Sequence, residues 1–418
     1  MAVDRSRRAA LLIGGIVAFV VVLTGLAVAG TRHTGAATPT EAVQDFFAAL
    51  DHGTVTDLLE QLPPAQADAL ADTLPDLATE LGRLGLVGAT DGDATFGLDV
   101  TAPEVTIDAY DEWIVRADLS GGTIALDPAA DGGTGAGLLT PDGRAALEQV
   151  TGLTLPGDEP EVLADRWPQL MVVRDGGGWR VSPGHTVGEQ WRLDEELPEP
   201  TWGEGVIAVG STTPDEVVPD LLRAYGAGDS GRMVSMAEPE ESVALQQFAT
   251  LAVPLWDGDL RRAMEEDGFF FRVDDIDVDV SGQGKRRTAT VTSFDGAFGD
   301  DQTTVDLRYA DGCLRITTTE LVGDAEPTVE QRCDGELHDD LPAAGPWSEL
   351  LALTALGRAF PTFSLAEHHG RWFISPTRTA LGTLTEVAAG LEPDQADELV
   401  TALDTAWVWG PEAATDTG

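Results

Sequence analysis

Changes in the spacing of hydrophobic residues divide the chain into segments of different kinds. Residues 9–30 carry no charged side chain and are rich in Leu, Ile, Val and Ala, and three arginines lie within residues 1–8. Because a helix needs about 20 apolar residues to cross a bilayer, we expect 9–30 to be a single-pass transmembrane helix and 1–8 a basic cytoplasmic tail. The alternative is a signal peptide that is cleaved after Ala27-Val28-Ala29. In both cases we expect the bulk of the chain to be extracytoplasmic, and the transmembrane helix, which we favour, places it at the cell membrane.

Beyond this run, helical spacing gives way to strand-like alternation, and this change occurs twice. The predicted helical segments are 39–50, 63–86 and 214–225, and the predicted strands are 105–110, 113–117, 275–280 and 288–292. Each set closes on an aromatic-bearing strand, Trp179-Arg180-Val181 in the first and Trp372-Phe373-Ile374 in the second. Helices followed by an antiparallel meander predict an α+β fold.

The two sets align on each other, which indicates an internal duplication. Thr38–Leu50 aligns without a gap on Thr213–Tyr225, and each begins with a threonine N-cap, a proline and then an acid three residues after the cap. The closing segments align in a second ungapped register. This register pairs Leu163, Trp167, Pro168, Leu170, Trp179, Val181, Ser182 and Pro183 with Leu356, Phe360, Pro361, Phe363, Trp372, Ile374, Ser375 and Pro376.

These registers set the expected domain organisation. We expect a first domain at 38–193, a linker at 194–212, a second domain at 213–410 and a disordered tail at 411–418. The linker contains the acidic, proline-bearing stretch Asp194–Pro200. Because prolines favour an extended spacer, we expect this stretch to be exposed and semi-rigid.

The charge balance excludes one large class of function. The 418 residues include 72 acidic and 25 basic side chains, which gives a formal net charge of −47, and Lys285 is the only lysine. Binding nucleic acid requires clustered Lys and Arg that neutralise phosphates, so we expect no nucleic-acid partner. A diffuse charge is screened beyond about 8 Å at physiological salt, which favours hydration of the surface over recognition of a cationic partner. A hydrophobic content of 43% excludes a disordered chain.

The chain has two cysteines, Cys313 and Cys333, both on the expected outer side and in the same predicted domain. In an oxidising compartment such a pair is usually bridged, so we expect a disulfide. In the chain-entropy model it stabilises the fold by about 3 kcal/mol. The chain contains no Cys-x-x-Cys motif, which argues against thiol-disulfide catalysis.

Short motifs at the ends of each repeat carry a family resemblance. In the second repeat a Gly228-Asp229 turn ends one helix and Met233 opens the next, and both repeats close on a Gly-x-Trp-x-x-Ser strand. The first repeat departs from this pattern with His52-Gly53-Thr54 at the turn. The motifs resemble those of the nuclear transport factor 2-like, or SnoaL-like, superfamily. The resemblance implies two duplicated cone-like domains, each with helices packed on a curved antiparallel sheet around a conical pocket.

Four residues are candidates for proton transfer in such a pocket, Tyr110, Asp108, Tyr225 and Tyr309. Isomerases and dehydratases of the superfamily use pocket Asp, Tyr or His groups, because burial moves the pKa of a carboxyl toward neutrality. No position in this chain matches a catalytic signature, and half-buried tyrosines are usually core residues. We therefore expect no catalytic residue and no enzymatic activity.

Two clusters have part of the character of a metal site. Asp275, Asp277 and Asp279 alternate along a predicted strand and offer the oxygen ligands that Ca²⁺ prefers, but a solvated acidic face explains them better. Glu367-His368-His369 offers two imidazoles, with His338 and His185 elsewhere in the chain. Zinc needs further ligands at defined spacing, so a surface turn is favoured. We expect no metal and no cofactor.

Together these features favour a noncatalytic accessory or scaffold protein of the cell envelope. Its membrane helix would tether it, and its domains would bind an envelope protein or an apolar ligand. A membrane helix followed by such domains is similar to actinobacterial tethered accessory proteins, including those of mammalian-cell-entry transport systems. One alternative is a small-molecule-binding or isomerase/dehydratase-like enzyme, which a buried Asp or His with a shifted pKa in a deep pocket would indicate. Another is the outer subunit of a secretion or conjugation channel.

Overall fold

The computed structural model describes residues 35–88, 96–126, 139–151, 156–157, 159–266, 268–322, 326–333 and 362–396. The chain divides into two compact units. Unit 1 includes the described residues up to Trp202 together with 391–396, and unit 2 includes those from Gly203 to Gly390. The tail expected at 1–8, the membrane helix expected at 9–30 and the tail expected at 411–418 lie outside the described residues. Among the described helices, none combines the length and hydropathy needed to cross a bilayer.

Unit 1 combines helices with antiparallel strands, as an α+β fold requires. Its helices are α2 (Pro39–His52), α3 (Val55–Leu59), α4 (Pro64–Arg83), α5 (Pro141–Thr151), α6 (Leu163–Arg166) and α7 (Pro183–Asp194), with the 3-10 turn η2 (Pro393–Gln395). Its strands are β1 (Leu98–Thr101), β2 (Glu104–Ala109), β3 (Ile114–Ser120), β4 (Thr123–Leu126), β5 (Glu161–Val162), β6 (Gln169–Asp175) and β7 (Gly178–Val181). The Thr38 side chain accepts from the Glu41 N–H, so α2 begins at the predicted cap.

In unit 1, β1 and β2 follow each other along one arm of a long hairpin, and β3 and β4 along the other arm. Both arms are interrupted at the same height. β2 pairs with β3 in the sheet β2-β3-β6-β7, and β1 pairs with β4 in the sheet β1-β4-β5. The β1–β4 ladder ends where the β2–β3 ladder begins, with two residues outside the ladder on each strand. One of these is Pro103, which cannot donate to a ladder. Another is Gly122, where a Cβ would lie 2.8 Å from the Thr101 carbonyl oxygen.

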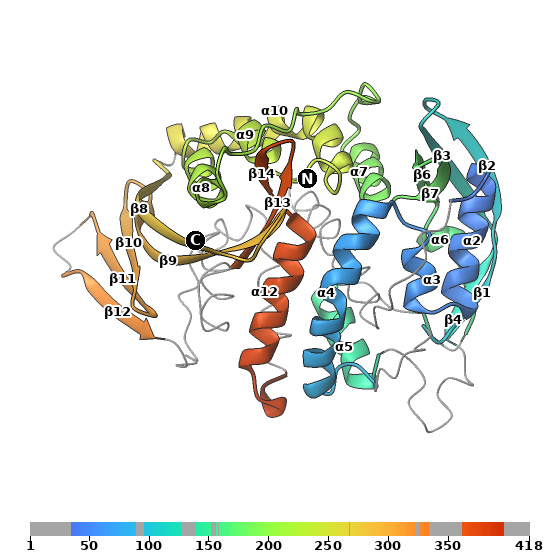
Figure 1. The fold of residues 1–418 in the computed structure, drawn as a ribbon, viewed down its shortest axis with the longest axis horizontal. Helices are drawn as coiled ribbons and strands as arrows, with labels where there is room; N and C mark the ends of the chain where they lie inside the picture. The colour runs from blue at the N-terminus through green and yellow to red at the C-terminus, as the bar shows by residue number, and fades with distance from the viewer. Residues whose placement is uncertain are drawn as a thin grey trace. The chain divides into compact units, whose positions relative to one another are not determined.

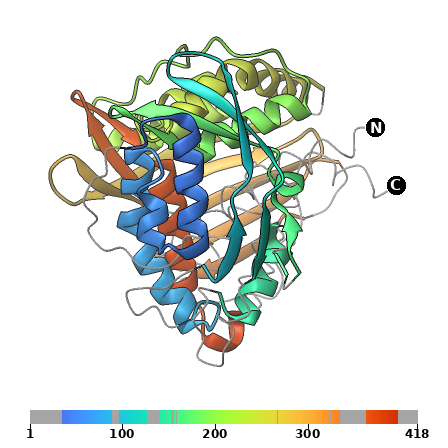
Figure 2. The same cartoon turned by 90° about the vertical axis from the view of Figure 1, so that its right-hand side faces the viewer.

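Helix α2 covers the strands of unit 1 (Figure 2). Its inward face consists of Val43, Phe46, Phe47 and Leu50, all buried, as the helical spacing predicts. The Phe47 ring also lies 6.5 Å from the ring of Trp167, which follows α6. Burying each such side chain contributes roughly 1.5–3 kcal/mol, so this face holds α2 on the sheet.

Unit 2 also combines helices with antiparallel strands, and its sheet is larger. Its helical elements are η1 (Pro214–Glu216), α8 (Val217–Gly226), α9 (Ser230–Ser235), α10 (Val243–Glu266) and α12 (Pro376–Gly390). Its strands are β8 (Phe270–Ser281), β9 (Arg286–Gly299), β10 (Thr303–Ala310), β11 (Cys313–Glu320), β12 (Thr328–Cys333), β13 (Thr362–His368) and β14 (Arg371–Ile374). The order across the antiparallel sheet is β12-β11-β10-β9-β13-β14, and β8 also pairs with β9.

The long strands β8 and β9 curve along their length (Figure 1). The register between them shifts at Val273/Asp275 and again at Asp277/Val278, and such bulges bend and twist a strand. Helix α8 packs against β8. The ring of Tyr225 in α8 meets that of Phe271 in β8 edge to face, with centroids 5.2 Å apart.

The two units share a set of hydrogen bonds at aligned positions. In unit 1 these bonds join Ala36 with Trp179, Val181 with Gln61, and Met171 with Thr186, and in unit 2 they join Ser211 with Trp372, Ile374 with Met236, and Ser364 with Thr379. The two sequence registers, extended by a few residues, place every one of these pairs opposite each other. An internal duplication predicts this agreement.

The units differ in the loop before their long helices. Gln61 lies three residues before α4, whereas Met236 lies seven residues before α10, so unit 2 has four extra residues at 239–242. The alignment then resumes, because the twelfth residue of each helix is a proline, Pro75 in α4 and Pro254 in α10. The extra residues bring additional carboxylates into unit 2.

The segment 194–212, where we expect a linker, contacts its own unit on each side of the division. Trp202 stacks on Tyr110 in unit 1, with ring centroids 5.0 Å apart. The Val206 N–H donates to a main-chain carbonyl of α10 in unit 2, at 2.9 Å. Between these two anchors, residues 203–205 are exposed. Residues 196, 198, 199 and 201 are exposed as well, so the segment combines exposed positions with these two contacts.

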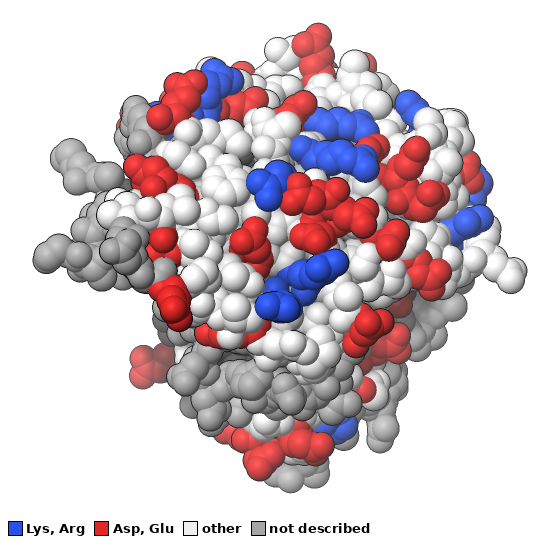
Figure 3. Space-filling model, turned by 90° about the vertical axis from the view of Figure 1, so that its left-hand side faces the viewer, with Lys and Arg blue, Asp and Glu red and all other residues white. Residues whose placement is uncertain are grey.

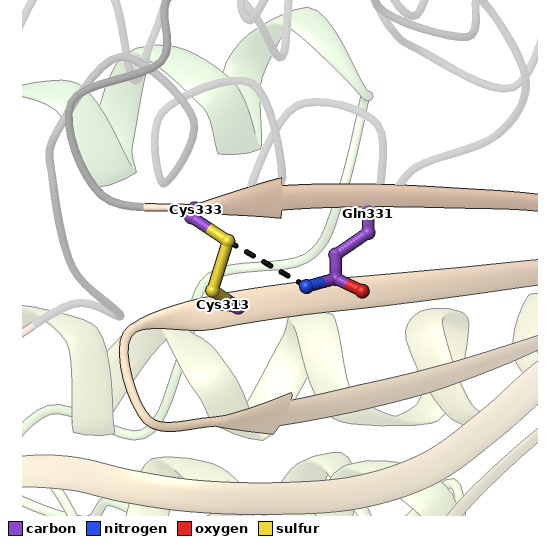
Figure 4. Close-up of a disulfide and its surroundings, with 3 residues drawn as sticks. All are labelled: Cys313, Gln331 and Cys333. Atoms are coloured by element: carbon purple, nitrogen blue, oxygen red, sulfur yellow. Dashed lines mark hydrogen bonds between the residues drawn. A yellow bond between two sulfur atoms is a disulfide. The ribbon is translucent and has the colours of Figure 1, made fainter.

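Cys313 and Cys333 form the expected disulfide (Figure 4). They lie directly opposite each other in β11 and β12, and Gln331 Nε2 lies 3.7 Å from the Cys333 sulfur. Strand β12 is the outermost described strand of its sheet and is largely exposed. The disulfide therefore fixes a strand that buries little surface of its own.

Candidate functional site

A polar network in unit 1 centres on Tyr110, one of the candidates from the sequence. Its hydroxyl donates to Glu189 Oε1 of α7 at 2.7 Å and accepts from Arg116 Nη1 of β3 at 2.9 Å. The Glu189 side chain is 0% exposed, and Arg192 donates to both of its oxygens at 2.7 Å. Glu189 and Arg192 are three residues apart in α7, so the helix places them side by side. Three donors thus satisfy one buried carboxylate.

The electrostatics of this network keep Tyr110 protonated. Burial raises the pKa of Tyr110 to about 12, and its hydrogen bond to Glu189 and the charge of Glu189 act in the same direction. A phenol with this pKa does not exchange protons efficiently near neutrality. Asp108, the neighbouring candidate, is 56% exposed and lies 3.3 Å from Arg116 Nη2. These contacts fit a structural role for both candidates.

The Tyr110 ring is covered by neighbours within unit 1. The Trp202 ring stacks on it with an interplanar angle of 12°, and the Arg116 guanidinium lies 5.7 Å from its centroid. The Trp202 indole N–H donates to Glu199 Oε1 at 2.5 Å. The end of unit 1 is therefore held against the network.

A serine and a histidine also meet in unit 1. Ser182 Oγ lies 2.8 Å from Nδ1 of His185, and both residues are buried. A catalytic serine must reach its substrate as well as its base, but Ser182 is 0% exposed. Ser182 also accepts from the His185 N–H at the start of α7, so this pair forms a helix cap.

A cluster in unit 2 brings together two buried carboxylates, a histidine and an arginine. Glu238 and Glu241 come from the loop before α10, and their side chains are 8% and 2% exposed. Arg378 Nη1 of α12 lies 3.6 Å from an oxygen of each. His368 Nε2 of β13 lies 2.9 Å from Glu238 Oε1. We call these four residues the unit 2 cluster.

The pKa of Glu241 is raised from its ordinary value. Burial raises the pKa of Glu241, and the nearby charge of Glu238 adds to this rise. Hydrogen bonds from Ser375 Oγ and the Thr377 N–H, both 2.5 Å long, oppose it. The second Glu238 oxygen, Oε2, is buried without a hydrogen-bond partner. Burial disfavours the ionised form of the Glu241 carboxyl.

The units carry different groups at the same helix N-terminus. Ser182 aligns with Ser375, and His185 aligns with Arg378. In each unit the second residue contacts the serine hydroxyl, at 2.8 Å in unit 1 and 3.2 Å in unit 2. Unit 1 lacks the four extra loop residues, and so it has no counterpart of Glu241. At this helix N-terminus, the combination of a buried glutamate, Glu241, with an arginine, Arg378, is therefore a feature of unit 2.

The remaining proton-transfer candidates lie apart from these networks. Burial raises the pKa of Tyr225, which packs on Phe271. Tyr309 lies in β10 and pairs with Phe294 of β9 and Leu314 of β11. Tyr110 belongs to unit 1, whereas Tyr225 and Tyr309 lie on α8 and β10 of unit 2.

The metal-site candidates are spread over different environments: His185 is buried in unit 1, and His368 is half-buried in the unit 2 cluster. Asp275, Asp277 and Asp279 are exposed on β8, on a sheet where acidic and basic side chains intermingle (Figure 3). His369 occupies an exposed turn, and His338 lies outside the described residues. Within the described part of the chain, no group of three or more His, Cys, Asp or Glu side chains is arranged to hold a metal ion.

Sequence reasoning missed the buried acids and their arginine partners. Glu189 and Arg192 carry a weak signal, a spacing of three residues, which brings two side chains together only if the segment is helical. Glu238 and Glu241 carry none, because they lie in an acidic stretch of an acidic chain. The alignment of the two repeats offers the one usable signal, since it isolates the extra residues 239–242.

No protein-family model, no curated protein sequence and no solved structure matches this chain.

Proposed function

We propose that the protein is a noncatalytic accessory or scaffold protein of the cell envelope, tethered to the membrane by residues 9–30. Its two units, taken as cone-like domains of the SnoaL-like type, bind an envelope protein or an apolar ligand. The tether rests on the uncharged run that follows three arginines. The extracytoplasmic location is supported by the Cys313–Cys333 disulfide, because disulfides persist in oxidising compartments.

The noncatalytic part of the proposal rests on the saturation of the Tyr110 network. The Tyr110 hydroxyl both donates and accepts, and the two oxygens of Glu189 take three hydrogen bonds. A general acid or base needs a proton that can leave and a substrate atom within hydrogen-bond reach. Groups whose hydrogen bonds are all made inside the fold serve stability instead.

An acid–base enzyme is the second candidate, and Glu241 favours it. A buried carboxyl with a raised pKa is a common feature of proton-transfer sites. Its two oxygens, however, already accept from Ser375 and Thr377. Glu241 therefore supports this second candidate less strongly than the saturated network supports the first.

A complementation experiment separates the two functions. In a strain that lacks the gene, the full chain would be compared with Y110F, with E241Q and with a form in which a cleavable secretion leader replaces residues 1–30. The readout is rescue of the growth or export defect that the deletion causes. Immunoblotting of membrane and periplasmic fractions would confirm equal amounts and location.

An accessory protein that works at the membrane predicts full rescue by Y110F and E241Q and loss of rescue by the released form. An enzyme acting on a diffusible substrate predicts the reverse, because release preserves its chemistry and removal of its proton-transfer group does not. Rescue by the released form together with loss in E241Q would refute the proposal.

A further inference from the structure

The loop before α10 contacts both the end of β14 and the start of α12. The Glu238 N–H donates to the Ile374 carbonyl at 2.7 Å, and the Ile374 N–H donates to the Met236 carbonyl at 2.9 Å. This loop therefore covers the outer edge of β14, the last strand on that side of the sheet among those described. Through Glu241 it also reaches Ser375 and Thr377 at the start of α12.

The charges at this joint balance only when a proton is present. Glu238 and Glu241 supply two negative charges, and Arg378 supplies one positive charge. A proton on Glu241 brings the sum of these charges to zero. Without it, one negative charge is left over in a buried site, where an uncompensated charge is costly.

We propose that residues 238–242 form a pH-sensitive clasp, which stays closed on β14 and α12 while the unit 2 cluster holds this proton and opens when the proton leaves. The groups that face the loop are Arg378 from α12 and His368 from β13, and the loop itself contributes Glu240. Glu240 is 70% exposed and lies 3.6 Å from His368 Nδ1. Ser375 and Thr377 contribute only neutral donors.

The direction in which pH acts on the clasp follows from the raised pKa of the Glu241 carboxyl. A folded-state pKa that is raised by burial means that the closed form binds the proton more tightly than the open form. The closed clasp is then fully stable below the unfolded pKa of a glutamic acid. The closed clasp loses stability as the pH rises through the raised pKa of Glu241. The clasp therefore opens toward higher pH.

Opening would uncover the edge of β14 at Ile374. The clasp bonds the carbonyl of this residue through the Glu238 N–H, and Met236, two residues before the clasp, accepts from its N–H. Release would leave these main-chain groups without their partners, as at other free strand edges. The unit 1 joint has no such device, because Pro63 stands in the place of Glu238 and the extra residues are missing.

Hydrogen exchange on the full chain, in detergent micelles if it is isolated from membranes, tests the clasp. Exchange would be measured by mass spectrometry from pH 5 to pH 8 on peptides that span 236–246 and 371–381, and expressed as protection relative to intrinsic rates. We expect protection in both peptides to fall by about threefold or more across this range, because proton release favours the open form. Peptides from α2 in unit 1 serve as the internal reference.

Two variants show which carboxyl group causes the loss of protection. E241Q keeps the shape and removes the ionisation, so its protection should not change with pH. E240Q changes an exposed carboxylate in the same loop and should keep the wild-type fall. If E241Q does not fold, E238Q replaces it, because that variant leaves one carboxylate with Arg378 and needs no proton for balance. Constant protection in the wild type, or an unchanged fall in the cluster variant, would overturn the proposal.

Discussion

Replacing Tyr110 by phenylalanine removes one donor from a carboxylate that water does not reach. Glu189 is 0% exposed and keeps only the two hydrogen bonds from Arg192 in this variant. A hydrogen bond to a charged group contributes about 1.5–3 kcal/mol. Tyr110 itself is only half-buried, so we expect a loss of about 2 kcal/mol in unit 1. The remaining partners of Arg116, Asp118 at 2.8 Å and Asp108, stay in place.

Hydrogen exchange of the α7 peptides in the full chain measures this loss. A change of about 2 kcal/mol corresponds to about 30-fold faster exchange at the slowest amides of α7. D108N is the matched control, because Asp108 contacts the same Arg116 from an exposed position and exposed ion pairs contribute about 0–1 kcal/mol. The wild type should also lose stability as the pH rises from 10 toward 12. The raised pKa makes the protonated tyrosine a stabilising form below that range, and Y110F should lack this loss.

Two outcomes would refute the reasoning on Tyr110. One is equal exchange in α7 for Y110F and D108N, which would mean that the buried carboxylate does not depend on the tyrosine. The other is a fall in stability between pH 10 and 12 that is the same in Y110F as in the wild type.

Three further predictions concern other parts of the fold. The double variant C313A/C333A should destabilise unit 2 by about 3 kcal/mol, seen as faster exchange in β11 and β12 with α7 unchanged, and an equal change in both units would contradict the assignment. W202A should remove a stacking contribution of about 1 kcal/mol and raise exchange in the 105–116 peptide, whereas unchanged exchange there would show that the stack adds nothing. Within residues 194–212, a Glu-specific protease should cut first after Glu204, in the exposed stretch 203–205, and an earlier cut after the half-buried Glu195 or the exposed Glu196 would show that the Trp202 anchor does not hold.

Local signals predicted the coarse fold of this chain well. The Thr-Pro start of α2, the inward face of Phe46 and Phe47, and the alternation in β8 all depend on residues within a few positions of each other. The disulfide was predictable because the chain has no other cysteine for Cys313 to pair with. These features need no knowledge of distant contacts.

The buried networks could not be predicted because their partners are far apart in the sequence. Tyr110 meets Glu189 across 79 positions, and Ser375 meets Glu241 across 134. No local pattern distinguishes a buried glutamate from the many exposed ones in this acidic chain. The stacking of Trp202 on Tyr110 could not be predicted for the same reason, since these two partners are also far apart in the sequence.

The cross-link between β11 and β12 also bears on how the protein is made. Before it is oxidised, β12 is held to the described part of the sheet by its ladder with β11, at an edge with few buried side chains. A chain that is exported as proposed therefore carries a loosely attached outer strand until it meets an oxidant. Oxidation on the far side then fixes this strand and makes the last stage of folding hard to reverse. In this way the compartment itself would set the time at which unit 2 matures.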